Sequence, residues 1–191
     1  MPIAIETPRL RLRQFQAADL PTFAAYRSDP ETARYQYWET PYTLEQAEQF
    51  LERMTHVTPG TPGEWLQLAL TLRDGGEMVG DCAFCVPADD TRQAELGYTL
   101  APAHRGRGYA TEGARALLGY LFVTYQLHRV FSRCDAENTP SARVLERIGM
   151  RREAHFVENS WFKGRWGSEF TYAILRREWQ AQADAGRPSP G

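Results

Sequence analysis

The sequence predicts an α/β (α+β) fold, built on one mixed, mostly antiparallel twisted sheet of about seven strands with helices on both faces. The chain has 191 residues, of which 42% are hydrophobic, which suits one domain with a substantial core. Three consecutive strand patterns joined by tight turns predict an antiparallel meander. The strand–helix–strand succession that follows predicts a crossover connection, which makes the sheet mixed.

The first elements are expected to be a strand and two helices. Arg9–Phe15 alternates polar and apolar residues, which is typical of a strand. Ala17–Asp29 has apolar residues at helical spacing, with Arg27 on the same side. Thr43 opens the second helix, because Thr43 and Gln46 have the spacing of a capping box.

The middle of the chain predicts the meander and then a helix. The strands are expected at Glu64–Arg73, Glu77–Val86 and Gln93–Ala101, and an Asp-Gly-Gly turn joins the first two. A helix begins near Tyr109, since apolar residues recur at helical spacing after it.

The last part of the chain predicts one more helix among three strands. Thr139 is expected to cap this helix, with Pro140 at its first position and Gly149 just after its end. The strands are expected at His128–Asp135, Arg151–Trp161 and Ser168–Arg176. The element order is therefore β-α-α-β-β-β-α-β-α-β-β, with a single domain over residues 1–179 and a disordered tail over residues 180–191.

Charge and hydropathy exclude several classes of partner. The net charge is −2 and no block of like charge occurs, which argues against nucleic-acid binding. Charged residues interrupt the apolar residues of the N-terminal segment, and the longest apolar run of the chain is too short to span a bilayer. We therefore expect no membrane association and a cytoplasmic location.

The cysteines and histidines predict no metal or redox centre. Cys82 and Cys85 form a C-x-x-C pattern, but they fall in a predicted strand, where residues three apart point to opposite faces. We interpret them as small buried side chains. The four histidines are scattered without the spacing of metal ligands.

The stretch HRGRGYATEG, which starts at His104, places two glycines and two arginines where a helix begins. The first N–H groups of a helix lack internal partners and carry partial positive charge. Gly106 and Gly108 would let the backbone approach an anion, and Arg105 and Arg107 could add charged contacts. This pattern favours a phosphate site, with a solvated glycine-rich turn as the alternative.

The type of phosphate ligand follows from residues that are absent or replaced. A Walker loop needs a lysine, which this stretch lacks, and Thr111 stands where a dinucleotide fingerprint has its third glycine. Arg105-x-x-Gly108-x-Ala110 resembles the acyl-CoA motif of the GNAT superfamily of N-acetyltransferases. Its setting, with ELGYTLAPAHRGRGYATEGARALL followed by AENTPSARVLERIGM, is similar to the Rim-type branch, whose named members acetylate N-termini of ribosomal proteins.

The resemblance implies a site for acetyl-CoA on one single GNAT-like domain. The pyrophosphate would lie on the backbone of Gly106–Thr111, and the pantetheine arm would pair with a strand that splays from its neighbour. Asn138 matches a family asparagine that contacts the arm; a turn residue is the alternative. The implied cofactor-binding residues are Thr99, Leu100, Arg105, Gly106, Arg107, Gly108, Tyr109, Ala110, Thr111, Asn138 and Ser141.

Acetyl transfer to an amine needs a donor to the oxyanion and a proton for the leaving thiolate. The backbone N–H of Leu100 is the candidate oxyanion donor. Many relatives place a tyrosine at the position of Leu145, whereas Rim-type members have a serine that Ser141 matches. Ser141 is therefore the candidate general acid. The alternative is that its hydroxyl only forms hydrogen bonds with backbone groups of the first helical turn.

The general base is expected to be a carboxylate on the strand leading into the site. Glu95 faces away from Ala94 and Leu96 and could act through water, with a merely paired carboxylate as the alternative. Arg133 stands where some relatives carry an acid. An α-amine, with a pKa of about 7.7–8.0 against about 10.4 for lysine, suits such a weak base better.

The acceptor is expected to bind where aromatic residues gather, and buried packing is the alternative for most of them. The candidate substrate-binding residues are Tyr35, Tyr37, Trp38 and Trp161. The function expected is acetyl transfer from acetyl-CoA to a small-molecule amine or a peptide or protein N-terminus, by direct attack and without a metal. The alternative is a non-catalytic acyl-CoA-binding module with the same fold. The closing strands are the candidate interface of a homodimer.

Overall fold

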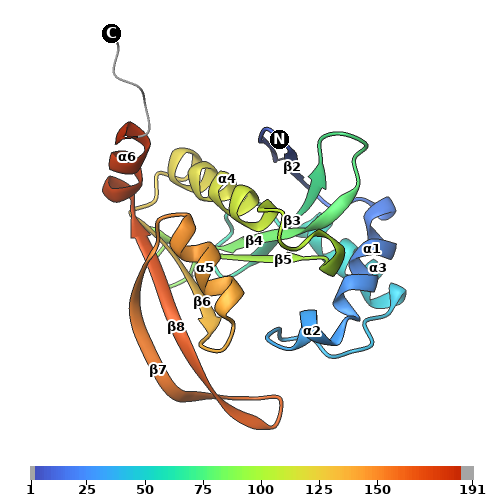
Figure 1. Cartoon of the computed structure of the whole chain (residues 1–191). Helices are drawn as coiled ribbons and strands as arrows, with labels where there is room; N and C mark the ends of the chain where they lie inside the picture. The colour runs from blue at the N-terminus through green and yellow to red at the C-terminus, as the bar shows by residue number, and fades with distance from the viewer. Residues whose placement is uncertain (1–2, 186–191) are drawn as a thin grey trace.

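The computed structural model describes residues 3–185 of the chain. Eight strands form one sheet in the order β1-β2-β3-β4-β5-β6-β8-β7, and all neighbours are antiparallel except β5 and β6 (Figure 1). The strands are β1 Ala4–Glu6, β2 Leu10–Arg13, β3 Trp65–Leu72, β4 Met78–Cys85, β5 Gln93–Leu100, β6 Arg129–Asp135, β7 Arg151–Phe162 and β8 Arg165–Leu175. The predicted mixed and mostly antiparallel sheet is confirmed.

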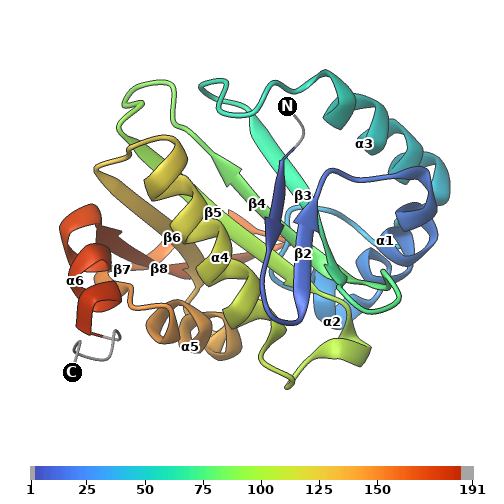
Figure 2. The ribbon, with the colours of Figure 1, turned by 90° about the horizontal axis from the view of Figure 1, so that it is seen from above.

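Helices cover both faces of the sheet, as the sequence predicted. Seen from above, α4 crosses one face, and α1 and α3 lie together at the other side of the molecule (Figure 2). The helices are α1 Leu20–Arg27, α2 Pro30–Ala33, α3 Leu44–His56, α4 Tyr109–Thr124, α5 Thr139–Arg147 and α6 Arg176–Ala185. Short 3₁₀ turns at Ala17–Asp19 and Pro102–His104 lead into α1 and the α4 loop.

Two hydrophobic clusters hold these layers together. The larger one packs α4 and α5 on the sheet, with Leu70, Leu96 and Leu117 fully buried. The smaller one packs α1 and α3 on the opposite face around Phe23. Phe23 lies 4.9 Å from Phe15 and 4.5 Å from Phe50 between ring centroids, so aromatic contacts add to the apolar area buried there.

Three elements of the structure were not predicted: strand β1, the four-residue helix α2 and helix α6. The additional strand β1 pairs with β2, which places Ile5 opposite Leu12; three residues are too few to show an alternating pattern in the sequence. Helix α6 runs to Ala185, so residues 180–185 of the predicted disordered tail are helical. Residues 186–191 lie outside the described residues, and the domain boundary at residue 179 stays a prediction.

The helix ends follow the predicted chemistry at α3 but not at α5. The capping box of Thr43 and Gln46 is present at α3, and Gly149 follows α5 with a φ of +90°. At α5 the prediction of Thr139 as N-cap is wrong: Asn138 is the cap, and its side-chain oxygen accepts the N–H of Ser141 at 3.2 Å. An amide oxygen caps a helix as well as a hydroxyl does, so the Asn138 side chain is engaged rather than free.

No helix in the described range is long and apolar enough to cross a membrane. The three cysteines are buried free thiols. Within residues 3–185 no group of His, Cys, Asp or Glu has the arrangement of a metal site.

Candidate active site

The central parallel strands separate and leave an open edge on β5. The pairing of β5 with β6 covers only Gln93–Glu95 and Arg129–Phe131. Both strands continue, β5 to Leu100 and β6 to Asp135. The predicted splay between these strands is therefore present, and the backbone of the second half of β5 faces a gap.

The register of β5 with β4 decides which backbone groups face this gap. Ala101 donates its N–H to Val79 at 2.9 Å, and Thr99 lies opposite Asp81. Because N–H groups alternate sides along an antiparallel strand, the N–H of Leu100 points away from β4, toward the gap. The same alternation turns the backbone of Thr99 to β4, so the strand backbone available to an extended ligand is that of Tyr98 and Leu100.

The predicted phosphate loop ends at the N-terminus of α4. Gly106 and Gly108 have φ values of +77° and +80°, and Gly108 is the N-cap. Residues other than glycine rarely adopt this left-handed conformation. Both glycines are exposed, and they precede the first N–H groups of a sixteen-residue helix, which lack partners within the helix and suit an anion.

The two arginines of the loop lie in different surroundings. The Arg105 guanidinium donates to the Thr32 hydroxyl at 2.6 Å and lies 3.8 Å from a carboxylate oxygen of Asp29, which ties the loop to α2. Arg107 is exposed, and its carbonyl accepts a hydrogen bond from Arg9 at 3.0 Å.

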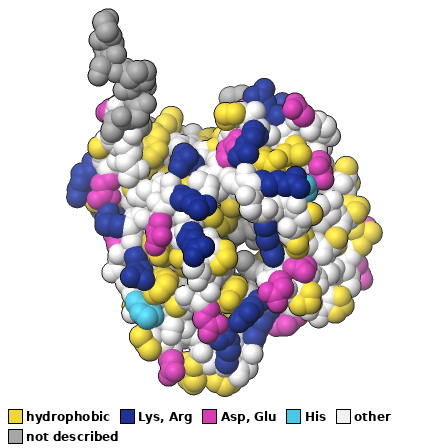
Figure 3. All heavy atoms as spheres, in the orientation of Figure 1, with side chains coloured by type: hydrophobic (Ala, Val, Ile, Leu, Met, Phe, Trp, Pro, Cys, Tyr) yellow, Lys and Arg dark blue, Asp and Glu magenta, His cyan; other side chains and the backbone are white. Residues whose placement is uncertain are grey.

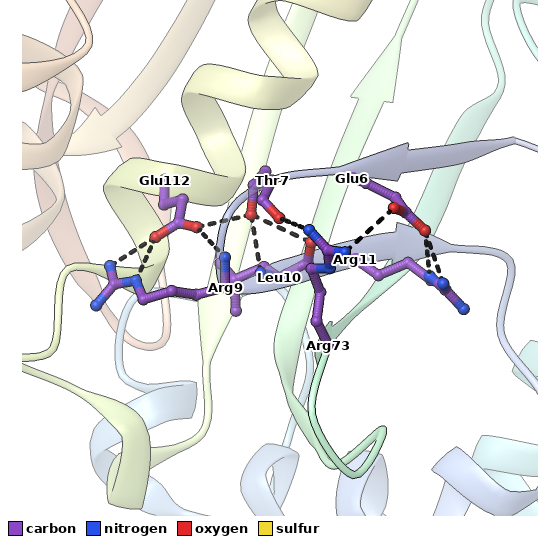
Figure 4. Close-up of polar contacts among 7 residues, drawn as sticks. All are labelled: Glu6, Thr7, Arg9, Leu10, Arg11, Arg73 and Glu112. Atoms are coloured by element: carbon purple, nitrogen blue, oxygen red, sulfur yellow. Dashed lines mark hydrogen bonds and ion pairs between the residues drawn. The ribbon is translucent and has the colours of Figure 1, made fainter.

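The N-terminal hairpin supports this loop through the Glu112 carboxylate. Glu112 lies in the first turn of α4 and accepts hydrogen bonds from the Thr7 hydroxyl at 2.6 Å, the Arg9 N–H at 3.0 Å and the Arg9 guanidinium at 2.6 Å (Figure 4). Burial acts to raise the pKa of Glu112, but these hydrogen bonds and the Arg9 charge outweigh it and lower the pKa. The β1–β2 turn thus holds the start of α4.

We expect Glu112→Gln to lower the free energy of unfolding by about 1–2 kcal/mol at pH 7, because charged hydrogen bonds become weaker neutral ones. The pKa of Glu112 is depressed in the folded chain. Its contribution is therefore complete above the unfolded pKa of about 4.3 and disappears as the pH falls through the folded value. Urea unfolding of both proteins at pH 7 and at stepwise lower pH measures the difference; a difference that does not shrink in acid contradicts the assignment.

A cavity of about 520 Å³ opens beside the gap between β5 and β6. In the orientation of Figure 1 the surface is hollowed near its centre, with basic and acidic side chains around the opening (Figure 3). Tyr35, Tyr37 and Trp38 line the cavity, together with Phe162 from the tip of β7. Trp161 does not appear among the described lining residues; it is 63% exposed and packs on Trp166.

Ser141 and Asn138 reach this cavity from the start of α5. The Tyr98 hydroxyl donates to the Ser141 carbonyl at 2.9 Å and lies 3.0 Å from Ser141 Oγ. Either hydroxyl can be the donor between Tyr98 Oη and Ser141 Oγ. Burial raises the pKa of Tyr98, which keeps this phenol neutral.

Glu95 lines the cavity, while its neighbours Ala94 and Leu96 are buried in the core. The Arg133 guanidinium donates to both oxygens of the Glu95 carboxylate, at 3.0 and 2.8 Å. The sequence left open whether Glu95 acts as a base or is only paired with a cation. In the structure Glu95 is paired with Arg133.

Sequence reasoning missed a buried polar network on the other side of the cavity. Asp81 is 1% exposed and accepts hydrogen bonds from the Tyr26 hydroxyl and from Gln67, the latter at 3.1 Å. Burial raises the pKa of Asp81, against the opposing charge of Arg27. One feature of the sequence indicates this network: Asp81 is the single charged residue in a strand whose residues are all buried. A buried carboxylate requires hydrogen-bond or charge partners.

One lysine anchors the β7–β8 turn, next to the cavity-lining residue Phe162. Lys163 is the chain's only lysine, and it lies in the β7–β8 turn. Its ammonium donates to the carbonyls of Ala33 and Trp38 at 2.9 and 2.8 Å. The hairpin tip is thereby fastened to the segment that carries the aromatic residues.

The fold and the site combine a glycine turn at a helix N-terminus, a split pair of parallel strands and an adjoining cavity, and the class of protein they define is a transferase. The family model described as an acetyltransferase (GNAT) domain matches residues 9–151. The chain belongs to the GNAT acetyltransferase family, which uses acetyl-CoA, and is an N-acetyltransferase.

The relatives agree with this assignment. The N-acetyltransferase YnaD of Bacillus subtilis is 34% identical over 175 residues, which cover 92% of this chain and 98% of that protein. The crystal structure of a GNAT-family acetyltransferase from Bacillus anthracis is 32% identical with a TM-score of 0.80, covering 92% of this chain and 99% of that one. Spermidine N-acetyltransferase from Vibrio cholerae, solved with CoA and spermine, shares the fold at 22% identity with a TM-score of 0.77, covering 91% of this chain and 99% of that one.

Proposed function

We propose that this chain transfers the acetyl group of acetyl-CoA to a primary amine by direct attack, without a metal. The observation that carries the proposal is the continuity of the site: the N-terminus of α4, the open edge of β5 and the aromatic cavity follow one another along β5. The pyrophosphate binds the backbone from Gly106 to Thr111, aided by Arg105 and Arg107. The arm extends along Tyr98 and Leu100, past Asn138.

The chemical step is assigned to three groups. The N–H of Leu100, directed into the gap, donates to the oxyanion that forms as the amine attacks the thioester carbonyl. Ser141 donates a proton to the departing thiolate sulfur and regains one through the Tyr98 hydroxyl or water. Glu95 takes the proton of the amine through water.

The pairing of Glu95 with Arg133 bears on the acceptor. Because both oxygens of the Glu95 carboxylate are engaged by the Arg133 guanidinium, this carboxylate reaches the amine only through a bridging water. Such a base suits an amine that is already partly neutral at pH 7, as an α-amine is and a lysine is not. We therefore favour an α-amine, in a small molecule or at a peptide N-terminus. The homodimer stays a prediction.

The experiment that tests the function is thermal unfolding with and without acetyl-CoA, followed by thiol release with a panel of amines. Acetyl-CoA at about 100 times its Kd adds roughly 2.7 kcal/mol to stability, a Tm rise of roughly 5–10 °C for this length. NAD serves as the control and is expected to give no rise. No rise with acetyl-CoA, or a rise without thiol release for any amine, contradicts the proposal.

Ser141→Ala is expected to lower kcat about 10²-fold, at the lower end of what a general acid contributes, with the KM for acetyl-CoA within about threefold of the parent value. Thr139→Ala removes an exposed hydroxyl from the same helical turn and is the control. Steady-state thiol release measures both. If the two variants turn over equally fast, Ser141 is a structural residue only.

A further inference from the structure

Arg27 is an unusual cation at the wall of the acceptor cavity. It ends α1 and is 7% exposed, and it lines the cavity beside Trp38 and Asp81. Four aromatic rings surround its guanidinium carbon, at 4.2 Å for Phe23, 4.0 Å for Trp38, 5.1 Å for Tyr42 and 5.4 Å for Phe50. These rings fix the direction of the guanidinium and favour its positive charge.

The guanidinium lacks the partners that a buried charge requires. Its Nε is buried without a hydrogen-bond partner, and within residues 3–185 it takes part in no ion pair. An arginine cannot lose its proton to relieve the cost of burial, and a buried charge without hydrogen bonds is strongly destabilising. The terminal N–H groups remain as donors, and the cavity is the open space next to them.

The one carboxylate that acts on Arg27 across the cavity is already engaged. Asp81 already accepts from Tyr26 and Gln67, and although the Arg27 charge acts on its pKa, the described side chains of Asp81 and Arg27 form no hydrogen bond or ion pair with each other. Asp81 also lies opposite Thr99 in the β4–β5 register, which places this part of the cavity next to the strand end where the acetyl group is proposed to lie. A ligand group that reaches Arg27 is therefore close to the reacting amine.

The other charged residues of the cavity have protein partners. Arg133 is paired with Glu95, Asp135 lies 3.8 Å from Arg165, and Glu169 accepts from Asn159 at 2.6 Å. These carboxylates favour a cationic amine at the mouth, but they offer nothing to Arg27. A polyamine, which carries cations alone, would leave Arg27 unpartnered.

We propose that Arg27 binds a carboxylate of the acceptor, so that the substrate is an amine that carries a carboxylate near the reacting nitrogen. This inference rests on the proposed function and narrows its substrate class. The two sources of this chemistry are a free amino acid and a peptide whose first residue is acidic. A planar guanidinium with two parallel N–H groups matches a carboxylate in shape and charge.

The test compares acceptors that differ only in the carboxylate. One arm pairs free amino acids with their amides; the other pairs tripeptide amides that begin with Asp or Glu with those that begin with Asn or Gln. Spermidine is the amine without an anion. Thiol release gives kcat/KM, expressed per neutral amine so that differences in amine pKa cancel. We expect at least a tenfold preference for the carboxylate in one arm, and that arm identifies the source.

Arg27→Met keeps an unbranched side chain among the rings and removes the donors. We expect it to reduce the preference to less than twofold, and Arg27→Lys to retain part of it. Arg34→Gln, which removes an exposed arginine outside the cavity lining, is the control and keeps the preference. The Tm rise with acetyl-CoA shows that each variant is folded and binds the donor. If Arg27→Met does not fold, the ratio of kcat/KM between carboxylate and amide acceptors in the parent protein tests the inference.

The outcomes separate the two proposals. If amides and spermidine react as fast as the carboxylates, the Arg27 inference is overturned and the acetyltransferase reaction stands. If acetyl-CoA binds but no amine yields thiol, the proposed reaction fails, and calorimetry with the CoA-saturated protein then tests Arg27. Carboxylate acceptors are expected to bind the parent protein at least tenfold more tightly than Arg27→Met; equal affinity would refute the inference.

Discussion

Gly108→Arg is expected to abolish acetyl-CoA binding, with a loss of affinity of more than 100-fold, or about 2.7 kcal/mol. Gly108 is the N-cap of α4 at a φ of +80°, and a Cβ there would lie 3.4 Å from Arg9 Nη2. The new side chain would leave from the point at which the pyrophosphate is proposed to meet the helix N–H groups. Arginine adds a positive charge, so a loss of binding reports on shape and not on charge repulsion.

Backbone strain must be separated from the loss of the site. A side chain at a positive φ costs of order 1–3 kcal/mol wherever it occurs. Gly75, in the β3–β4 turn, has a φ of +82° and no atom within 4 Å of a built Cβ. Gly75→Arg therefore carries the same strain and charge far from α4. We expect both variants to lose similar Tm and only Gly75→Arg to keep the acetyl-CoA-dependent rise; if both keep it, the phosphate loop lies elsewhere.

Gly80→Ala is expected to reduce kcat/KM at least tenfold and to lower the free energy of unfolding by about 1–3 kcal/mol, the usual cost of overpacking. A Cβ at Gly80 would lie 2.9 Å from Leu100 Cδ2 and 3.0 Å from Leu100 Cα, and closer still to the Thr99 carbonyl oxygen. Backbone atoms cannot rotate away as a flexible side chain can. The second half of β5 must therefore move, and the Leu100 N–H moves with it.

Small displacements matter here because the reacting groups have to be held within a fraction of an ångström. Gly119→Ala is the matched control, since its Cβ would meet Trp179 at 3.6 Å, an ordinary contact. Steady-state rates and urea unfolding of the two variants measure the effect. If Gly80→Ala loses stability but keeps its rate, the position of Leu100 is not critical for the reaction.

Local patterns were sufficient for much of the fold. The capping box at Thr43, the glycine turn between β3 and β4 and the three strands of the meander depend on residues within a few positions of each other. The wrong cap at α5 shows the limit of such patterns. Asn138 and Thr139 are both good caps and adjacent in sequence, and in the structure the Asn138 side chain takes the cap.

The sequence predicted the glycine turn before α4 and the separation of β5 from β6, but not the side-chain pairings around them. The positive φ values of Gly106 and Gly108 agree with what a glycine-rich helix start requires. In contrast, Glu112 is bound by Thr7 and Arg9, more than a hundred positions away. Arg133 approaches Glu95 because β5 and β6 are neighbours in the sheet.

The sequence by itself determined the mixed sheet with helices on both faces, the glycine turn at the start of α4 and the family resemblance. These features are encoded in periodicity, turn residues and contiguous motifs, which act over short stretches of chain. Only the tertiary structure decided which side chains meet: the hairpin that holds Glu112, the ion pair at Glu95 and the aromatic enclosure of Arg27. Such contacts form when distant elements pack, and their energies depend on burial and partner geometry, which no local pattern specifies.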